Sequence, residues 1–151
     1  MKTLTLAAVA ALLPLAAQAH DGMHVEDAYV RSSNAVTAAA FMRLENHRAV
    51  DCTLQAVTTP DAERAERHSH QEQDGIMRMG RIEGGITTPA GDSHLLQRGG
   101  DHIMLLGLTK PLKQGDHVAL TLDFGDCGTV DLTAPVDNRR KPMGGASAHA
   151  H

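Results

Sequence analysis

The stretch VALTLDFGDCGTVDLTAPV (residues 118–136) contains two segments in which every second residue is apolar, separated by a short turn. The apolar positions are Val118, Leu120, Leu122 and Phe124 in the first segment and Val130, Leu132, Ala134 and Val136 in the second. Alternation with a period of two is typical of a β-strand with one buried face. The turn Gly125-Asp126-Cys127-Gly128 between the two segments therefore predicts a β-hairpin.

Further segments with β-strand character precede this hairpin, and turn residues separate them. They are residues 25–31, 38–46, 52–58, 63–70, 76–82, 94–97 and 103–108. Short strands with frequent turns predict an all-β sandwich or barrel. The Ala-rich residues 36–44 also fit a helix, but the segments around them are strands, so a strand is predicted there too.

The first 19 residues are predicted to be a secretory signal peptide. Lys2 precedes an apolar run over residues 4–17, and Ala17-Gln18-Ala19 matches the small-x-small cleavage pattern. This run is shorter than the ~20 residues that a membrane-spanning helix needs, and no later segment is apolar enough to span. We therefore expect a periplasmic protein with a single domain over residues 20–137 and a flexible tail over residues 138–151.

Composition argues against several classes of partner. The chain has a formal net charge of −4 and no basic cluster, and it contains two Phe, one Tyr and no Trp. A nucleic acid or an anionic membrane surface would call for basic patches, and bases or sugars for aromatic platforms. We therefore expect no nucleic acid and no membrane span, and we expect a monomer.

The two cysteines, Cys52 and Cys127, are far apart in the sequence. An oxidising compartment allows them to form a structural disulfide, which is the favoured interpretation. Two unpaired thiols, a redox pair and a thiolate metal ligand remain as alternatives, although there is no C-x-x-C motif.

Three pairs with i, i+2 spacing carry the functional prediction: His68-x-His70, Met77-x-Met79 and His102-x-Met104. Alternate residues of a strand point to the same face, so each pair can aim two side chains at one point. Imidazole and thioether donors together make a soft site, and Cu(I) is the soft metal that prefers thioethers. A blue-copper centre would also need a cysteine ligand, and Zn(II) prefers nitrogen, thiolate or carboxylate donors.

Each pair also has a purely structural interpretation. His68 and His70 could be the polar end of a strand, and two methionines on one face, Met77 and Met79, are more often core residues than ligands. His102-Ile103-Met104 is more informative, because Ile103 is expected in the core and its two neighbours then share the opposite face. The other histidines, His47, His94 and His117, are predicted to face solvent.

The arrangement His68-x10-Met79, followed after 22 residues by His102-x-Met104, resembles the H-x10-M-x21-H-x-M motif of the periplasmic PCu(A)C copper chaperones. The middle spacing is one residue longer here. The segments 27–31, 74–79, 86–91, 99–108 and 111–116 are also similar to this family, so the resemblance covers about residues 24–136.

The resemblance implies a cupredoxin-like Greek-key β-sandwich with a Cu(I) site formed by His68, Met79, His102 and Met104. It further implies delivery of copper to the CuA centre of cytochrome c oxidase, through subunit II or through another copper chaperone. His70 and Met77 are not part of the motif, and they are expected to lie nearby as alternative ligands.

A second site that prefers Cu(II) is a further possibility at the chain ends. The tail resembles the His/Met-rich extensions of some family members, and His20 could chelate Cu(II) together with a free α-amine after cleavage. The candidate residues are Met143, His149, His151 and His20. We expect a binding protein and not an enzyme; the alternatives are a copper-dependent redox enzyme and a β-sandwich interaction module without metal.

Overall fold

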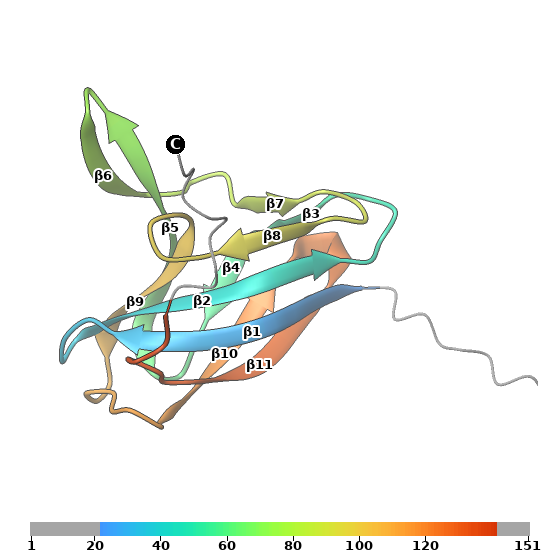
Figure 1. The fold of residues 1–151 in the computed structure, drawn as a ribbon. Helices are drawn as coiled ribbons and strands as arrows, with labels where there is room; N and C mark the ends of the chain where they lie inside the picture. Colours follow the sequence, from blue (N-terminus) through green and yellow to red (C-terminus); the bar gives the residue numbers. More distant parts are fainter. Residues whose placement is uncertain (1–21, 142–151) are drawn as a thin grey trace, which may run out of the picture.

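The computed structural model describes residues 22–141, and nearly all of its regular structure is β-strand (Figure 1). The strands are β1 (Met23–Ser32), β2 (Thr37–Asn46), β3 (Cys52–Leu54), β4 (Ala56–Thr58), β5 (Ala62–Gln73), β6 (Ile76–Arg81), β7 (Ile86–Thr88), β8 (Ser93–Leu96), β9 (His102–Leu108), β10 (His117–Asp123) and β11 (Thr129–Pro135). A short 3-10 helix, η1 (Gly125–Cys127), connects the last two. The predicted signal peptide lies outside the described residues.

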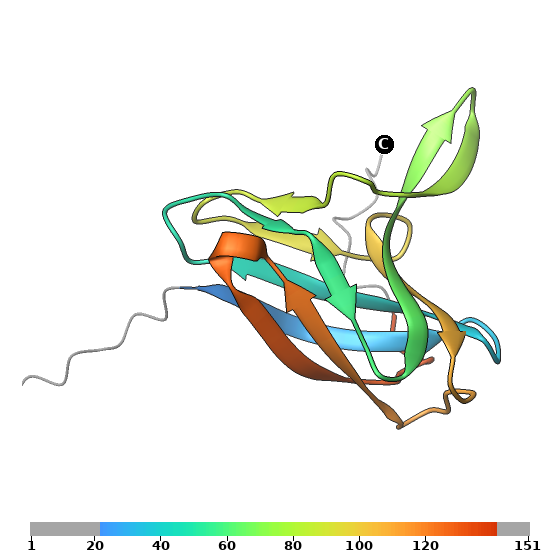
Figure 2. The same ribbon diagram turned by 180° about the vertical axis from the view of Figure 1, so that it is seen from behind.

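The strands form a β-sandwich, as the sequence predicts. One sheet has the order β1-β2-β9-β5-β6, with β8 pairing with β2 beyond the end of β9, and a three-stranded sheet has the order β11-β10-β4. Figure 2 shows the three-stranded sheet in front of β1 and β2. Strands β3 and β7 form a small third sheet. Within residues 22–141, no helix has the length and hydropathy needed to cross a bilayer.

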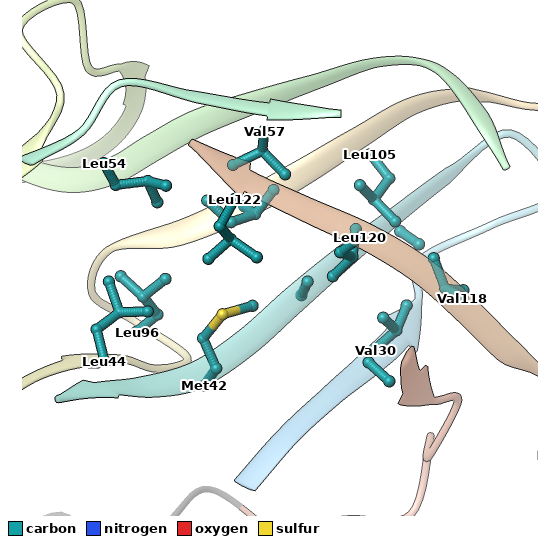
Figure 3. Close-up of a cluster of buried hydrophobic side chains, with 14 of the residues drawn as sticks. Val30, Met42, Leu44, Leu54, Val57, Leu96, Leu105, Val118, Leu120 and Leu122 are labelled. Atoms are coloured by element: carbon teal, nitrogen blue, oxygen red, sulfur yellow. The ribbon is translucent and has the colours of Figure 1, made fainter. Parts of the chain in front are cut away.

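The core lies between the two larger sheets. Val118, Leu120 and Leu122 of β10 are 0%, 2% and 0% exposed, and they face Met42 of β2 and Leu105 of β9 (Figure 3). This is the alternation that predicted the hairpin, and β10 pairs with β11 in a continuous antiparallel register. Burying each such side chain stabilises the fold by about 1.5–3 kcal/mol.

Strand β2 explains why residues 36–44 also fitted a helix. Ala38, Ala40 and Met42 enter the main core, while Ala39 and Phe41 are buried on the other face in a small cluster with Tyr29. A strand that is buried on both faces has a nearly continuous apolar sequence instead of an alternating one. The strand prediction is confirmed, and the ambiguity reflects burial on two sides.

Cys52 and Cys127 form a disulfide, which joins β3 to η1. The favoured interpretation of the cysteines is therefore confirmed, and they cannot serve as thiolate ligands. The bond links the small third sheet to the turn of the β10–β11 hairpin, across 75 positions of sequence.

Two strand predictions need correction. The predicted strand 52–58 is interrupted at Gln55, and its halves belong to different sheets, since β3 pairs with β7 while β4 pairs with β10. The amide of Gln55 donates instead to the carbonyl of Asp123. Strand β7 was not predicted, because only three residues separate the Gly84-Gly85 turn from Pro89.

The hairpin formed by β5 and β6 projects beyond the body of the sandwich (Figure 1). Every residue of β6 is exposed, and Met77 and Met79 are 58% and 50% exposed. The interpretation of these two methionines as core residues is therefore wrong. Strand β6 is an edge strand with few neighbours. Its alternating apolar and polar residues look the same in sequence as those of a half-buried strand.

The chain continues past β11 along the outer side of β1. The side-chain oxygen of Asn138 accepts a hydrogen bond from the Ser32 amide at 2.8 Å, and the guanidinium of Arg140 lies 4.6 Å from the ring centre of Tyr29 and 3.6 Å from Asp27. Residues 138–141, which were predicted as the start of the tail, thus pack against the domain.

Candidate metal centre

The predicted ligands gather on the outer face of the large sheet, where β9, β5 and β6 lie side by side. His68 of β5 is directly opposite His102 of β9, and His70 of β5 is directly opposite Met79 of β6. Directly opposed residues of an antiparallel pair project from the same face of the sheet. Met104 follows His102 by two positions and joins the same face.

The inward neighbours confirm this orientation. Ile103 and Leu105 are both 0% exposed in the core, so His102 and Met104 project from the opposite side of β9, as predicted. An open cavity of about 210 Å³ lies on that face. Its lining residues are Ser33, Ala39, Phe41, His70, Met79, Arg98, Gly99, His102 and Met104.

His102 and Met79 meet above β5. The Nε2 atom of His102 lies 3.2 Å from the Sδ atom of Met79, and the Nδ1 atom lies 2.9 Å from the carbonyl oxygen of Gly100. A carbonyl oxygen only accepts hydrogen bonds, so Nδ1 carries the proton and Nε2 of the neutral ring carries a lone pair. A lone pair of nitrogen therefore faces a thioether sulfur, and a metal ion would be attracted to both.

The surroundings of His102 favour this neutral form. The residue is 3% exposed, and burial lowers its pKa below the ordinary value of 6.5. The Gly100 carbonyl acts in the opposite direction, and positive charge on His70 or His68 would lower the pKa further. A neutral imidazole is the form that binds metals, so His102 is ready to bind at neutral pH.

His68 is held by a carboxylate. Its Nε2 atom lies 2.9 Å from Oε2 of Glu66, so Nε2 carries the proton and Nδ1 carries the lone pair. That Nδ1 atom is buried and has no hydrogen-bond partner in the described part of the chain. The bond to His68 also holds the pKa of Glu66 below its usual value. In metal-binding histidines, the nitrogen that does not bind the metal typically donates its N–H to a carboxylate or a carbonyl.

His70 and Met77 occupy different positions. His70 lines the cavity, its ring centre is 5.4 Å from that of His102, and its Nδ1 lies 3.4 Å from the same Gly100 carbonyl. Met77 lies opposite Glu72, nearer the tip of the hairpin, and like His68 it does not line the cavity.

The remaining candidates are remote or undescribed. His20, Met143, His149 and His151 lie outside the described residues. His47 is exposed as predicted, whereas His94 is half-buried and bound to Asp101 at 2.9 Å, so the prediction that His94 faces solvent is only partly right.

The sequence did not single out three features of the centre. Glu66 orients His68, the Gly100 carbonyl orients His102, and Phe41 forms an apolar wall with its ring 6.1 Å from that of His102. Glu66-x-His68 has the same i, i+2 spacing as the other pairs and could have been found from it. A backbone carbonyl and the wall from β2 leave no such signal.

In the arrangement that the structure describes, the donors that lie close together include methionine. Within residues 22–141, no three His, Cys, Asp or Glu side chains are gathered as a metal-binding group by themselves. The donors that do approach one another closely are an imidazole and a thioether, which together prefer a soft ion.

The sequence matches one protein-family model and a related protein. A family model named "Putative lipoprotein LpqE-like" matches residues 23–136. The "Putative lipoprotein Lxx21020" of Leifsonia xyli subsp. xyli is 32% identical over 116 residues, which cover 77% of this chain and 70% of that protein.

Solved structures with the same fold are PCuAC domains and a related protein. The copper-bound PCuAC domain of PmoF2 matches with a TM-score of 0.63 and 21% identity, covering 76% of this chain and 92% of that domain. Apo-DR1885 of Deinococcus radiodurans has a TM-score of 0.59 and 30% identity, covering 92% of this chain and 95% of that one. Its Cu(I) form has the same score and identity and covers 76% and 79%. The resemblance to the PCu(A)C family and its β-sandwich is thereby confirmed.

Proposed function

This chain belongs to the LpqE-like family, and from that premise we propose that it is an exported copper chaperone that carries Cu(I) at His68, Met79, His102 and Met104. The observation that carries the proposal is the 3.2 Å approach of the His102 Nε2 lone pair to the Met79 sulfur. Two electron-rich atoms that face each other at this distance repel unless an electron-poor centre joins them. The copper-bound relatives support copper as that centre.

The four donors match Cu(I) in type and number. Thioethers of Met79 and Met104 favour Cu(I), and they do not titrate as a thiolate would. The imidazoles of His68 and His102 are each oriented by one hydrogen bond that leaves the other nitrogen available. The disulfide supports an oxidising compartment, in which free thiolate clusters would be oxidised.

The exposure of the donors suggests an order for copper transfer. Met79 is 50% exposed on the edge strand β6, whereas His102 is 3% exposed. An acceptor can therefore replace Met79 first and His102 last, so that copper remains bound throughout the exchange. Such stepwise ligand exchange needs no catalytic turnover, and two thioethers oppose cycling to Cu(II). We therefore propose a carrier and not an oxidase.

We propose the CuA centre of cytochrome c oxidase subunit II as the final acceptor, reached directly or through a second copper chaperone. A CuA domain offers cysteine and histidine donors that can displace thioethers. Transfer is tested by mixing the Cu(I)-loaded chain with an apo CuA domain and following the CuA absorption. No transfer to this domain or to another copper chaperone would contradict the proposed acceptors.

Cu(I) binding is tested by titrating the chain, without residues 1–19, against a competing chromophoric Cu(I) chelator. We expect one equivalent to be held tightly, with sulfur and nitrogen scattering in the X-ray absorption spectrum. Met104→Leu should weaken binding strongly, whereas Met42→Leu, which changes a methionine on the core face of β2, should not. Weak or non-stoichiometric binding would favour the interaction module, and copper-dependent oxidation of ascorbate beyond that of free copper would favour the redox enzyme.

A further inference from the structure

A third imidazole lies beside the four proposed Cu(I) ligands. The ring centre of His70 is 5.4 Å from that of His102, and the ring centre of His68 is 5.9 Å from it. His68 and His70 are alternate residues of β5, so both rings lie on the same face next to His102. The Cu(I) set uses two of these three rings, which leaves His70 without a role in it.

All three rings have one nitrogen bound to an oxygen acceptor. The Gly100 carbonyl accepts from Nδ1 of His102 at 2.9 Å and from Nδ1 of His70 at 3.4 Å, and Glu66 accepts from Nε2 of His68 at 2.9 Å. Three lone pairs therefore remain, on Nε2 of His102, Nε2 of His70 and Nδ1 of His68. One backbone carbonyl thus orients two of the rings in the same way.

We propose that the same centre also binds Cu(II), through His68, His70 and His102, with His70 taking the place of the two methionines. This inference rests on the proposed function and extends it to the second oxidation state of the same ion. Cu(II) prefers imidazole nitrogen, whereas thioether sulfur prefers Cu(I). The two ligand sets share His68 and His102, and they differ in which of the other donors complete the site.

Side-chain rotations separate the two sets. The three rings do not yet converge on one point within the described residues, so His68 and His70 must rotate toward His102. His70 is half-buried at the open cavity, and its 3.4 Å contact with the Gly100 carbonyl is longer than the 2.9 Å contact of His102, so its ring is held less firmly than that of His102. The chain would accept copper in either oxidation state, and this proposal assigns it no electron transfer of its own.

The test compares both ions on one set of variants. His20, His149 and His151 lie outside the described residues and could bind Cu(II) themselves, so all three are first changed to glutamine. In this background we expect one tightly bound Cu(II), with pulsed EPR showing couplings from three imidazoles. His70→Gln should reduce the count to two and weaken Cu(II) binding by at least about tenfold, the smallest loss typical of removing even an outer partner of a metal-bound imidazole.

Two further variants make the comparison specific. His70→Gln should leave Cu(I) affinity unchanged, whereas Met104→Leu should weaken Cu(I) and leave the Cu(II) spectrum unchanged. His117→Gln is the matched control, because His117 is an exposed residue of β10 in the three-stranded sheet and should affect neither ion. Unfolding temperatures of the variants confirm that they are folded.

Other outcomes would overturn the inference in distinct ways. An unchanged imidazole count and Cu(II) affinity in His70→Gln would exclude His70 as a ligand. Cu(I) binding without Cu(II) binding in the background chain would reject this inference and leave the proposed function standing. If neither ion binds, the proposed function fails as well. The imidazole count of the background chain is a test in itself, because it needs no change at His70.

Discussion

The Nε2–H of His68 donates to the carboxylate of Glu66 at 2.9 Å, and this one bond determines which nitrogen of His68 is available. The other nitrogen, Nδ1, is buried with its lone pair unpaired among the described residues. Glu66 lies opposite Met104 of β9, so it belongs to the same face as the proposed ligands. The carboxylate therefore acts as a positioning group for a metal-binding imidazole.

Removal of this carboxylate should weaken copper binding without unfolding the protein. We expect Glu66→Ala to lower Cu(I) affinity by about 10–100-fold, the range typical of losing an outer partner of a metal-bound histidine. The measurement is a competition titration with a chromophoric chelator. Glu72→Ala is the control, because Glu72 lies on the same face of β5 but opposite Met77. Equal losses in both variants would indicate a general effect of charge.

The two methionines of β6 should differ, although both are exposed and both lie on the same face. Met79→Leu removes the sulfur that lies 3.2 Å from His102, and we expect Cu(I) affinity to fall by at least about tenfold, equivalent to about 1.4 kcal/mol. Met77→Leu should bind Cu(I) like the unmodified chain, because Met77 lies opposite Glu72, nearer the hairpin tip, whereas Met79 lies opposite His70. Chelator competition on the two variants checks this, and a larger loss in Met77→Leu would place the centre nearer the hairpin tip.

The stability of the copper-free protein should depend on pH through His102. Burial lowers the pKa of His102 in the folded state, while an unfolded chain has the ordinary value of about 6.5. Just below this pH the unfolded state binds more protons, so the free energy of unfolding falls as the pH falls from about 6.5 toward the folded-state pKa.

Urea unfolding at pH 7.5 and 5.5 measures this dependence. In His102→Gln, which cannot titrate at this position, the loss between the two pH values should be smaller than in the unmodified chain. An equal loss in both proteins would show that other groups account for the pH dependence.

The disulfide should stabilise the fold and leave the metal centre unaffected. Closing a loop across 75 positions is worth about 4 kcal/mol in the chain-entropy model, and removal of native disulfides typically costs about 2–5 kcal/mol. We therefore expect the double variant Cys52→Ala/Cys127→Ala to unfold at a lower urea concentration. Its Cu(I) affinity should be unchanged, since β3 and η1 carry none of the proposed ligands. A loss of affinity in the folded variant would contradict this separation.

The outline of the fold could be predicted because the order of apolar and polar residues within a strand indicates which of its faces is buried. The alternation in β10 and β11 is local, and it predicted both strands and the hairpin between them. The prediction was less successful where neighbours decide the outcome. Gln55 interrupts a strand because the two halves pair with different partners. Strand β6 is an edge strand because, among the strands of residues 22–141, it pairs with β5 alone.

A strand repeats every two residues, so the sequence alone places His68 on one face with His70, and His102 with Met104. How these two faces meet depends on the pairing of the strands. The register of β5 against β9 and β6 places His68 opposite His102 and His70 opposite Met79, and it depends on hydrogen bonds between strands that are far apart in the chain. The tertiary structure also determines which nitrogen of each imidazole keeps a lone pair, because Glu66 accepts from His68 and the Gly100 carbonyl accepts from His102.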